Sequence, residues 1–414
     1  MSYIRGTPGF IGPKLSQARI LRRMNVSTLA GVLGLGRATV SAYEKGKITP
    51  SPEVMGNICN CLNMPLDFFV SDSSPIPETN TPVFYRSHAT SLKLARDSAE
   101  LKSRILASVA AYLEQYIDFP NINLPKFDLP SDPTTLNEEK IRKIAEKTRT
   151  YWGLSLGPIS DLVCLLENNG ILVGRYPFNC KRLDAFSHYV DNQPQIIIGA
   201  DKGSAVRQRF DASHELGHLI LHRNIPAKLV KDKDFHQLLE DQANCFAFDF
   251  LFPSKAFKAE VRRCSLNEFL RLKRKWKVSV AAQARRASEP DMEGKIAMKT
   301  LFQTMGRRGW KTSEPYDDEF ICEVPRFMKE GLDLILESNT QSPKDISNYF
   351  KMQFSDIEEI AGLPQGYFSN FSQGSVLELK KDRGNSGRTQ DTLSAPTADS
   401  PKVASFLDAF AQRK

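Results

Sequence analysis

The sequence lacks any apolar run that approaches the roughly 18 residues of a membrane-spanning helix. Its opening residues, MSYIRGTPGF, also lack the apolar core of a secretory signal peptide. Both absences argue against export and against a membrane partner. We therefore expect a soluble protein in the cytoplasm.

Cysteine is present but follows no recognisable pattern. The seven cysteines are scattered along the 414 residues, and no two have C-x-x-C spacing. This argues against a cysteine-based zinc finger or a disulfide framework and fits thiols that are kept reduced. Hydrophobic residues make up 41% and charged residues 25% of the chain, close to the average for folded soluble proteins, so bulk disorder is also excluded.

The length predicts two or three domains, at about 150 residues per domain. Turn-rich polar residues from Ser71 to Pro82 have the composition of a linker. Strand-like runs around 170–175 and 195–199 interrupt a helical pattern, so we expect an α+β fold that is mostly helical. The expected segments are a helical N-terminal domain (1–72), a linker with a long helix near 91–117 (73–135), a mixed domain with a basic helical end (136–312), a helical C-terminal region (313–379) and a disordered tail (380–414).

Residues 25–47 have the pattern of a helix-turn-helix. Asn25 can cap a first helix, Gly34 allows a sharp turn, and Arg37 to Glu44 would form the second helix. Such a second helix would enter the major groove of DNA with its N-terminal half. A small bundle that contacts only protein is the alternative. The predicted contacts to base edges or phosphates are Arg37, Thr39, Ser41, Lys45 and Lys47.

The longer string L-A-G-V-L-G-L-G-R-A-T-V-S-A-Y-E-K-G-K-I-T-P-S, residues 29–51, resembles the XRE (Cro/C1-type) helix-turn-helix family. The resemblance covers about residues 14–70 and departs from the family pattern at Val26, where a Gln is usual. It implies an all-α domain that binds double-stranded operator DNA. Because such modules usually act as dimers on paired half-sites, it also implies a homodimer.

The strongest chemical signal is the string S-H-E-L-G-H-L-I-L-H at residues 213–222. Residues four apart share one face of a helix, so His214 and His218 can present both imidazoles to one tetrahedral Zn²⁺. Glu215 lies one position around the helix, near the metal without being a ligand, where it can take a proton from water. Three of the six histidines lie in this stretch, which makes two accidental surface histidines a poor explanation.

A catalytic zinc needs a third protein ligand. A second helix is expected to begin near Glu240 and to end at Pro253, and we choose Glu240 as that ligand. Asn244, one turn later, would share its face and could orient a liganding histidine through a hydrogen bond. Asp241 and His236 compete for the ligand role.

The strings H-E-L-G-H-L-I-L-H and E-D-Q-A-N-C-F-A-F-D-F-L-F-P together resemble the ImmA/IrrE family of metallopeptidases, over about residues 136–286. The resemblance implies a minimal zincin-like domain with a small sheet. It also implies Zn²⁺ held by His214, His218 and Glu240, with Glu215 as the catalytic base. The oxyanion of the reaction would need a donor besides the metal. The candidates are His222, His188 and Tyr189, and His222 has an alternative role as a neighbour that orients the zinc helix.

Together the two resemblances imply a DNA-binding transcriptional regulator that carries a zinc metalloendopeptidase domain. Its substrate would be a regulatory protein, such as a repressor, in a stress, phage or mobile-element operon. The alternative is an antitoxin-like or sensor regulator, whose zinc domain binds a partner protein such as a toxin with little or no proteolysis. The intact Glu215 favours an enzyme, because a purely structural zinc needs no free carboxylate beside it.

The formal net charge of +8 is unevenly distributed along the chain. Residues 1–72 carry 8 basic and 4 acidic side chains, whereas residues 258–312 carry 15 basic and 5 acidic ones. A solvated helix face is the simplest explanation for a run such as Arg271 to Lys275. A second phosphate-contacting surface, or a dock for an acidic protein, is the alternative.

Overall fold

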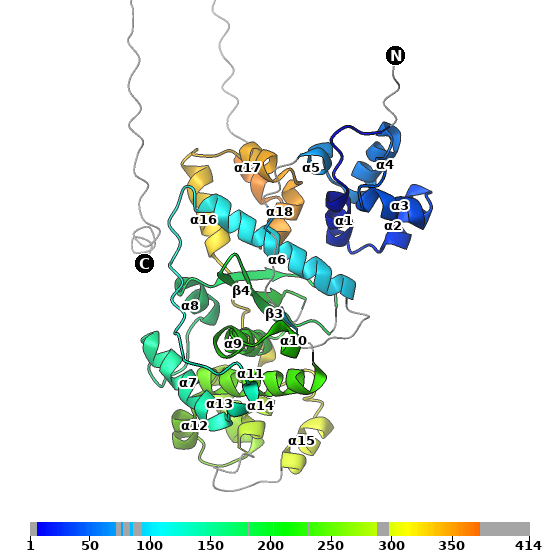
Figure 1. Ribbon diagram of the computed structural model, residues 1–414. Helices are drawn as coiled ribbons and strands as arrows, with labels where there is room; N and C mark the ends of the chain where they lie inside the picture. Colours follow the sequence, from blue (N-terminus) through cyan, green and yellow to red (C-terminus); the bar gives the residue numbers. More distant parts are fainter. Residues whose placement is uncertain are drawn as a thin grey trace, which may run out of the picture.

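The computed structural model of the chain describes residues 6–71, 76–77, 83–85, 93–180, 182–201, 203–230, 232–287 and 298–372. Helices predominate and surround one small sheet, which confirms the predicted mostly helical α+β fold (Figure 1). None of the helices in the described part of the chain combines the length and apolarity needed to span a bilayer. The predicted tail, 380–414, lies outside the described residues.

The N-terminal unit is a bundle of short helices. They are α1 (Gly12–Leu21), α2 (Val26–Leu33), α3 (Arg37–Glu44), α4 (Pro52–Leu62) and α5 (Leu66–Val70). The Asn25 side chain accepts the amide N–H of Thr28, and Gly34 adopts the left-handed conformation, with φ of 65°, that turns the chain toward α3. Arg19 of α1 forms two hydrogen bonds, of 2.5 and 2.9 Å, with the carboxylate of Glu44 and so holds the end of α3. The predicted helix-turn-helix is therefore present.

Four strands form one sheet in the order β1-β3-β4-β2. They are β1 (Phe84–Tyr85), β2 (Leu172–Tyr176), β3 (Ala185–Val190) and β4 (Gln193–Gly199). β2 and β4 are the two predicted strands, and they pair in parallel. β3 and β4 form an antiparallel hairpin that turns at Asp191 and Asn192, both at positive φ, which Asp and Asn tolerate. The sequence did not indicate β3, because this strand is buried on both faces and lacks polar alternation.

Helices cover both faces of the sheet (Figure 1). α6 (Lys93–Leu113), which is the predicted long helix, lies against one face, and α9 (Ala205–Leu221) lies against the other. On the α6 side, Tyr176 of β2 donates its hydroxyl to the carbonyl of Ala99 at 2.7 Å. On the α9 side, Ser187 of β3 donates its hydroxyl to Glu215 at 2.7 Å. Because successive side chains of a strand point to opposite faces of the sheet, those of β3 lie alternately on the α6 side and on the α9 side.

The remaining helices of the central part pack on α9, on α11 or on one another. They are α7 (Glu138–Tyr151), α8 (Leu162–Asn168), α10 (Ala227–Val230), α11 (Lys233–Leu251), α12 (Ser254–Glu260), α13 (Leu266–Trp276), α14 (Val280–Arg286) and α15 (Met298–Arg307), with 3-10 turns η2 (Pro133–Thr135) and η3 (Asp317–Glu319). α11 lies directly against α9, and Gly217 makes this possible. A Cβ at Gly217 would stand 3.2 Å from the ring of Phe246 and 3.3 Å from the backbone of Ala243.

The C-terminal helices connect the N-terminal unit to the rest of the molecule. They are α16 (Phe327–Glu337), α17 (Pro343–Phe350), α18 (Phe354–Ile360) and α19 (Tyr367–Ser372). One hydrophobic cluster runs from Leu29 of α2 through Leu113 of α6 and Phe186 of β3 to Ile357 of α18. The divisions expected at 72, 135 and 312 therefore do not separate independent hydrophobic cores, and the domain limits stay a prediction.

The basic run on α13 is neutralised within the molecule. Lys273 is fully buried and lies 3.0 Å from Glu314 and 2.6 Å from Asp317. The other basic residues of the run also have carboxylate partners: Arg271 with Glu268, Arg274 with Glu319, and Lys275 with Glu260. These pairs favour a structural role for the run over a second phosphate-contacting surface.

Candidate metal centre and nucleic-acid interface

Helix α9 presents the histidine motif to the interior. Ser204 caps the helix by accepting the amide N–H of Arg207, and the helix then continues without interruption to Leu221. His214 and His218 are one turn apart and only 3% and 2% exposed, because α11 covers this face of α9. Both imidazoles therefore meet the next helix rather than solvent.

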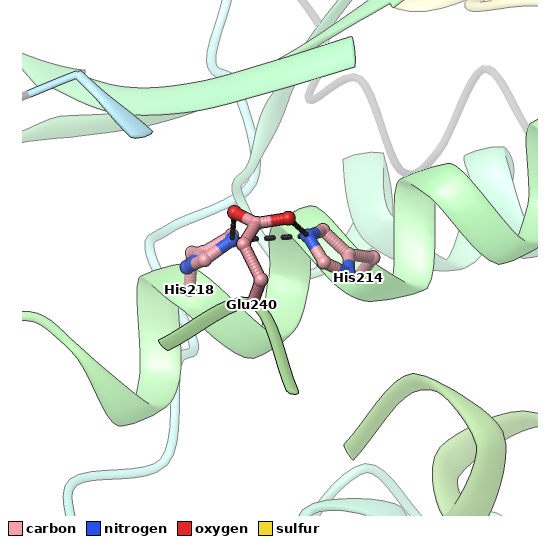
Figure 2. A group of neighbouring side chains, drawn as sticks. All are labelled: His214, His218 and Glu240. Atoms are coloured by element: carbon pink, nitrogen blue, oxygen red, sulfur yellow. Dashed lines mark hydrogen bonds and ion pairs between the residues drawn. The ribbon is translucent and has the colours of Figure 1, made fainter. Parts of the chain in front are cut away.

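The third group of the cluster is Glu240 of α11, as the sequence predicted. Its two carboxylate oxygens lie 3.3 Å from His214 Nε2 and 3.3 Å from His218 Nε2. The two Nε2 atoms are themselves 3.0 Å apart. Figure 2 shows the carboxylate of Glu240 facing both rings, which come from neighbouring turns of α9. All the potential ligand atoms lie within 4.8 Å of one another, a spacing suited to one metal ion.

The protonation of His214 shows why a cation fits here. The Nδ1 atom of His214 lies 3.0 Å from the Oδ1 atom of Asn244, and since an amide oxygen only accepts, Nδ1 carries the hydrogen. In the neutral form of the ring, the Nε2 atom then presents a lone pair to Glu240 Oε2, a buried oxygen 3.3 Å away. Two lone pairs facing each other repel unless a cation lies between them. The predicted orienting role of Asn244 agrees with this contact.

The imidazole of His218 is neutral because it is buried. Burial lowers the pKa of His218 to about 4, so its imidazole is uncharged near neutral pH. Its Nδ1 atom lies 2.9 Å from Nδ1 of His222, on the side away from Glu240. The cluster thus combines two imidazoles and one carboxylate, which is a ligand set typical of catalytic zinc.

Glu215 lies beside this cluster and is fully enclosed. Burial raises the pKa of Glu215 to about 8, while the hydrogen bond from Ser187 favours the charged form. Ser187 was missed in the sequence because it lies 28 positions before Glu215, on a strand that showed no period. Had β3 been recognised, its pairing with β4 would have placed one of its faces over α9.

The structure separates the three candidates for oxyanion stabilisation. His222 lies behind His218, on the side away from Glu240, with Nε2 3.1 Å from Oε1 of Gln242. His188, another candidate, is on the opposite face of the sheet from the cluster, 2.9 Å from the hydroxyl of Ser103. Tyr189 is on the α9 side, but its hydroxyl donates to the carbonyl of Leu219.

The competing ligands are not part of the cluster. The side chain of Asp241 is exposed and accepts a hydrogen bond from Gln237 at 3.0 Å. The group of potential ligands within the described residues consists of His214, His218 and Glu240 and does not include His236. The choice of Glu240 from its helical position therefore agrees with the geometry.

The predicted DNA-reading residues lie around the outer side of α3. Arg37, Lys45 and Lys47 are exposed, whereas Thr39 and Ser41 are half-buried. The inner side of α3 is occupied by the buried Val40 and Tyr43. In Figure 1, α2 and α3 are on the side of the N-terminal unit that is remote from α6 and α18. This arrangement leaves the outer side of α3 accessible to a duplex.

Comparison with known protein families adds two findings. Residues 15–69 match the helix-turn-helix family. Residues 166–288 match the family of IrrE N-terminal-like domains. The IrrE-like segment begins at the end of α8 and contains the sheet strands β2 to β4, α9 and α11, and so the whole His-His-Glu cluster. No curated protein matches the chain significantly.

These matches confirm both resemblances seen in the sequence. The chain combines a DNA-binding helix-turn-helix with a peptidase-family domain, which is the composition of a DNA-binding regulator. The His-His-Glu cluster lies within the peptidase-family part.

Proposed function

We propose that this protein is a transcriptional regulator whose IrrE-like segment is a zinc-dependent endopeptidase. Its substrate would be a regulatory protein, such as a repressor in a stress, phage or mobile-element operon. The proposal is carried by one observation: Glu215, a buried carboxylate held by Ser187, lies next to three convergent ligand atoms without being one of them.

The composition of the cluster favours a catalytic over a structural metal. Structural zinc sites are usually closed by four protein ligands, whereas catalytic sites have three and leave one position for water or substrate. Within the described part of the chain, the cluster has three members, His214, His218 and Glu240. A fourth position is therefore available beside Glu215.

The chemistry assigns distinct roles to these residues. When bound, Zn²⁺ would polarise the scissile carbonyl and acidify a water molecule. Glu215 accepts the proton of the attacking water and delivers it to the leaving amine. Ser187 orients the Glu215 carboxylate through its 2.7 Å hydrogen bond, and Asn244 holds the ring of His214.

One observation favours the alternative, a regulator that binds a partner protein without cleaving it. The three residues of the cluster and Glu215 are each at most 6% exposed, so a peptide can reach them only if covering segments move. In that alternative, the IrrE-like segment would be a sensor or an antitoxin-like platform, and DNA binding would be the only output.

The change Glu215→Gln separates the two functions. Because Glu215 is not a ligand, the variant should bind Zn²⁺ as the unaltered chain does, and it should lose proteolysis because an amide cannot accept the proton. We would express both forms in cells and compare new protein N-termini by mass spectrometry, together with the output of the adjacent operon. Glu139→Gln, the same change at an exposed position of α7, is the control.

Either result is decisive. New N-termini that appear with the unaltered chain and the control, but not with Glu215→Gln, support the endopeptidase. An operon response that is identical in all three forms, with no difference in N-termini, would refute proteolysis and favour the partner-binding regulator.

The helix-turn-helix supplies the proposed DNA output. Arg37, Thr39, Ser41, Lys45 and Lys47 are the residues that we propose contact operator DNA, and two copies of the chain would occupy two half-sites as a homodimer. The exposure of Arg37 at the start of α3 and of Lys45 directly after its end supports this proposal.

A further inference from the structure

A chain of buried hydrogen bonds leads from the backbone of residues 133–136 to the proposed metal site. The side chain of Gln242, on α11, contacts the carbonyl oxygens of Pro133 and Leu136 through Nε2, at 2.7 and 3.0 Å. Its Oε1 atom faces Nε2 of His222 at 3.1 Å. His222 in turn faces His218, with 2.9 Å between the two Nδ1 atoms.

The two backbone carbonyls fix the direction of every hydrogen bond in this chain. A carbonyl oxygen only accepts, so the amide group of Gln242 must direct its two N–H bonds at Pro133 and Leu136. Its Oε1 atom then faces His222 as an acceptor, and His222 must carry its hydrogen on Nε2. A neutral His222 protonated on Nε2 has a lone pair on Nδ1, which accepts the Nδ1–H of His218.

The tautomer of His218 decides which of its two nitrogen atoms can bind the metal. When His218 carries its hydrogen on Nδ1, its Nε2 atom has the lone pair, and this is the atom that lies 3.3 Å from Glu240. The opposite tautomer would direct an N–H at the position of the metal and prevent coordination. The side chains involved are all nearly inaccessible, at 3% exposure for Gln242, 1% for His222 and 2% for His218. The protein itself must therefore select the tautomer.

We infer that Gln242 is a positioning residue that sets the tautomer of His218 through His222, and so prepares His218 Nε2 to bind the metal. This inference rests on the proposed metal site. Asn244 sets the tautomer of His214 directly, because its Oδ1 atom lies 3.0 Å from Nδ1 of that histidine. Helix α11 thus supplies Glu240 as a ligand and, within the next turn, the two amides that orient both imidazoles of α9.

Two substitutions at position 242 test this role. Gln242→Leu removes the acceptor for His222, and we expect the affinity for Zn²⁺ to fall by about 10- to 100-fold, as for other residues that orient metal-binding histidines. Gln242→Glu keeps an acceptor for His222 but loses the amide donors to Pro133 and Leu136, so it should retain most of the affinity. Gln237→Leu, at an exposed position of the same helix, is the matched control.

Zn²⁺ affinity is measured for each full-length form by competition with a chromophoric chelator, which requires no substrate. If Gln242→Glu loses as much affinity as Gln242→Leu, the residue acts by anchoring residues 133–136, and the tautomer role is refuted. Unchanged affinity in Gln242→Leu would also refute it. Failure of the unaltered chain to bind Zn²⁺ would instead refute the proposed metal site, which keeps the two failures distinct.

The tautomers can also be observed directly. Of the six histidines, His218 and His222 should show ¹⁵N shifts of the Nδ1–H and Nε2–H forms, respectively, in the Zn²⁺-loaded chain labelled at histidine. In Gln242→Leu we expect the signals of His222 to move toward a mixture of tautomers, whereas those of His188, on the other face of the sheet, should stay unchanged. A pattern that is the same with and without Gln242 would overturn the inference.

Discussion

At the scale of single residues, the charge on Glu215 is decided by two opposing effects. Burial raises its pKa to about 8, and the hydroxyl of Ser187 opposes this by donating a hydrogen bond to the ionised carboxylate. A cation held by the neighbouring cluster would also favour the ionised form. Ser187 therefore helps to keep Glu215, the proposed base, charged in a site from which solvent is nearly excluded.

We predict that Ser187→Ala raises the pKa of Glu215. A hydrogen bond to a charged group contributes about 1.5 to 3 kcal/mol, which corresponds to an increase in pKa of about 1 to 2. Because Glu215 can act as a base only when it is ionised, proteolytic activity should be lost at low pH. In the variant, this loss of activity should occur at a higher pH. The measurement is the pH profile of cleavage of a substrate found by N-terminal mapping.

The control for this prediction is Ser103→Ala. It removes a buried hydroxyl of α6, which contacts His188 on the opposite face of the sheet. The two variants lose similar groups, yet only Ser187→Ala should move the profile. An equal movement in both would mean that loss of packing, not the contact with Glu215, is responsible.

At the scale of secondary-structure elements, the pair α9 and α11 forms the site. α9 provides two imidazoles and Glu215, α11 provides Glu240 and the amides, and Gly217 lets the two helices approach. α3 is the corresponding element of the N-terminal unit. Its inner side is fixed by Val40, Tyr43 and the ion pair of Glu44 with Arg19, so its outer side has a defined shape.

We predict different effects for two substitutions, Arg37→Ala on α3 and Lys45→Ala directly after it. Lys45→Ala should weaken binding to any DNA duplex and reduce the slope of log affinity against log salt by about 1, because one phosphate contact is lost. Arg37→Ala should instead cost about 1 to 3 kcal/mol at a preferred sequence and leave binding to random duplex nearly unchanged, since its proposed contact is a base edge. Fluorescence anisotropy with selected and random duplexes at several salt concentrations measures both.

Lys344→Ala, a similar change at an exposed position of α17, is the control for charge alone. If it reduces the salt slope as much as Lys45→Ala does, binding depends on the overall charge of the chain, and α3 is not the reading element.

At the scale of the whole molecule, the N-terminal unit is held by the C-terminal helices. Arg22, at the end of α1, forms two hydrogen bonds with the carboxylate of Asp356 in α18, at 2.6 and 2.8 Å. The same guanidinium donates to the carbonyls of Leu62 and Asn63 at the end of α4, at 2.7 and 3.0 Å. α18 also reaches α6, where Glu359 pairs with Lys102 at 2.7 Å. α18 therefore joins the proposed DNA reader to the helix that covers the sheet (Figure 1).

We predict that Asp356→Asn loosens this connection. The pair is mostly buried, with side chains 22% and 10% exposed, so loss of the charge should lower the free energy of local opening by roughly 2 kcal/mol. Hydrogen–deuterium exchange should become faster in α1 and α4 and stay unchanged in α9 and α11. Glu337→Gln, at an exposed position of α16, is the control, and equal exchange in all three forms would contradict the prediction.

The sequence determined the parts of this protein that depend on local spacing. Helical periodicity alone places His214 and His218 on one face, and Asn25, Gly34 and the run from Arg37 to Glu44 specify the helix-turn-helix, because caps, turns and helix faces are set by neighbours in the chain.

Tertiary structure decided every contact between residues far apart in the sequence. Ser187 meets Glu215, Gln242 meets His222, and Arg22 meets Asp356 only after the sheet and helices have packed. These contacts have no local signature, because burial on both faces removes the polar alternation of β3, and a polar residue on a helix does not reveal its partner. The sequence thus determined which groups we propose for metal binding and DNA reading, whereas packing decided which side chains contact those groups.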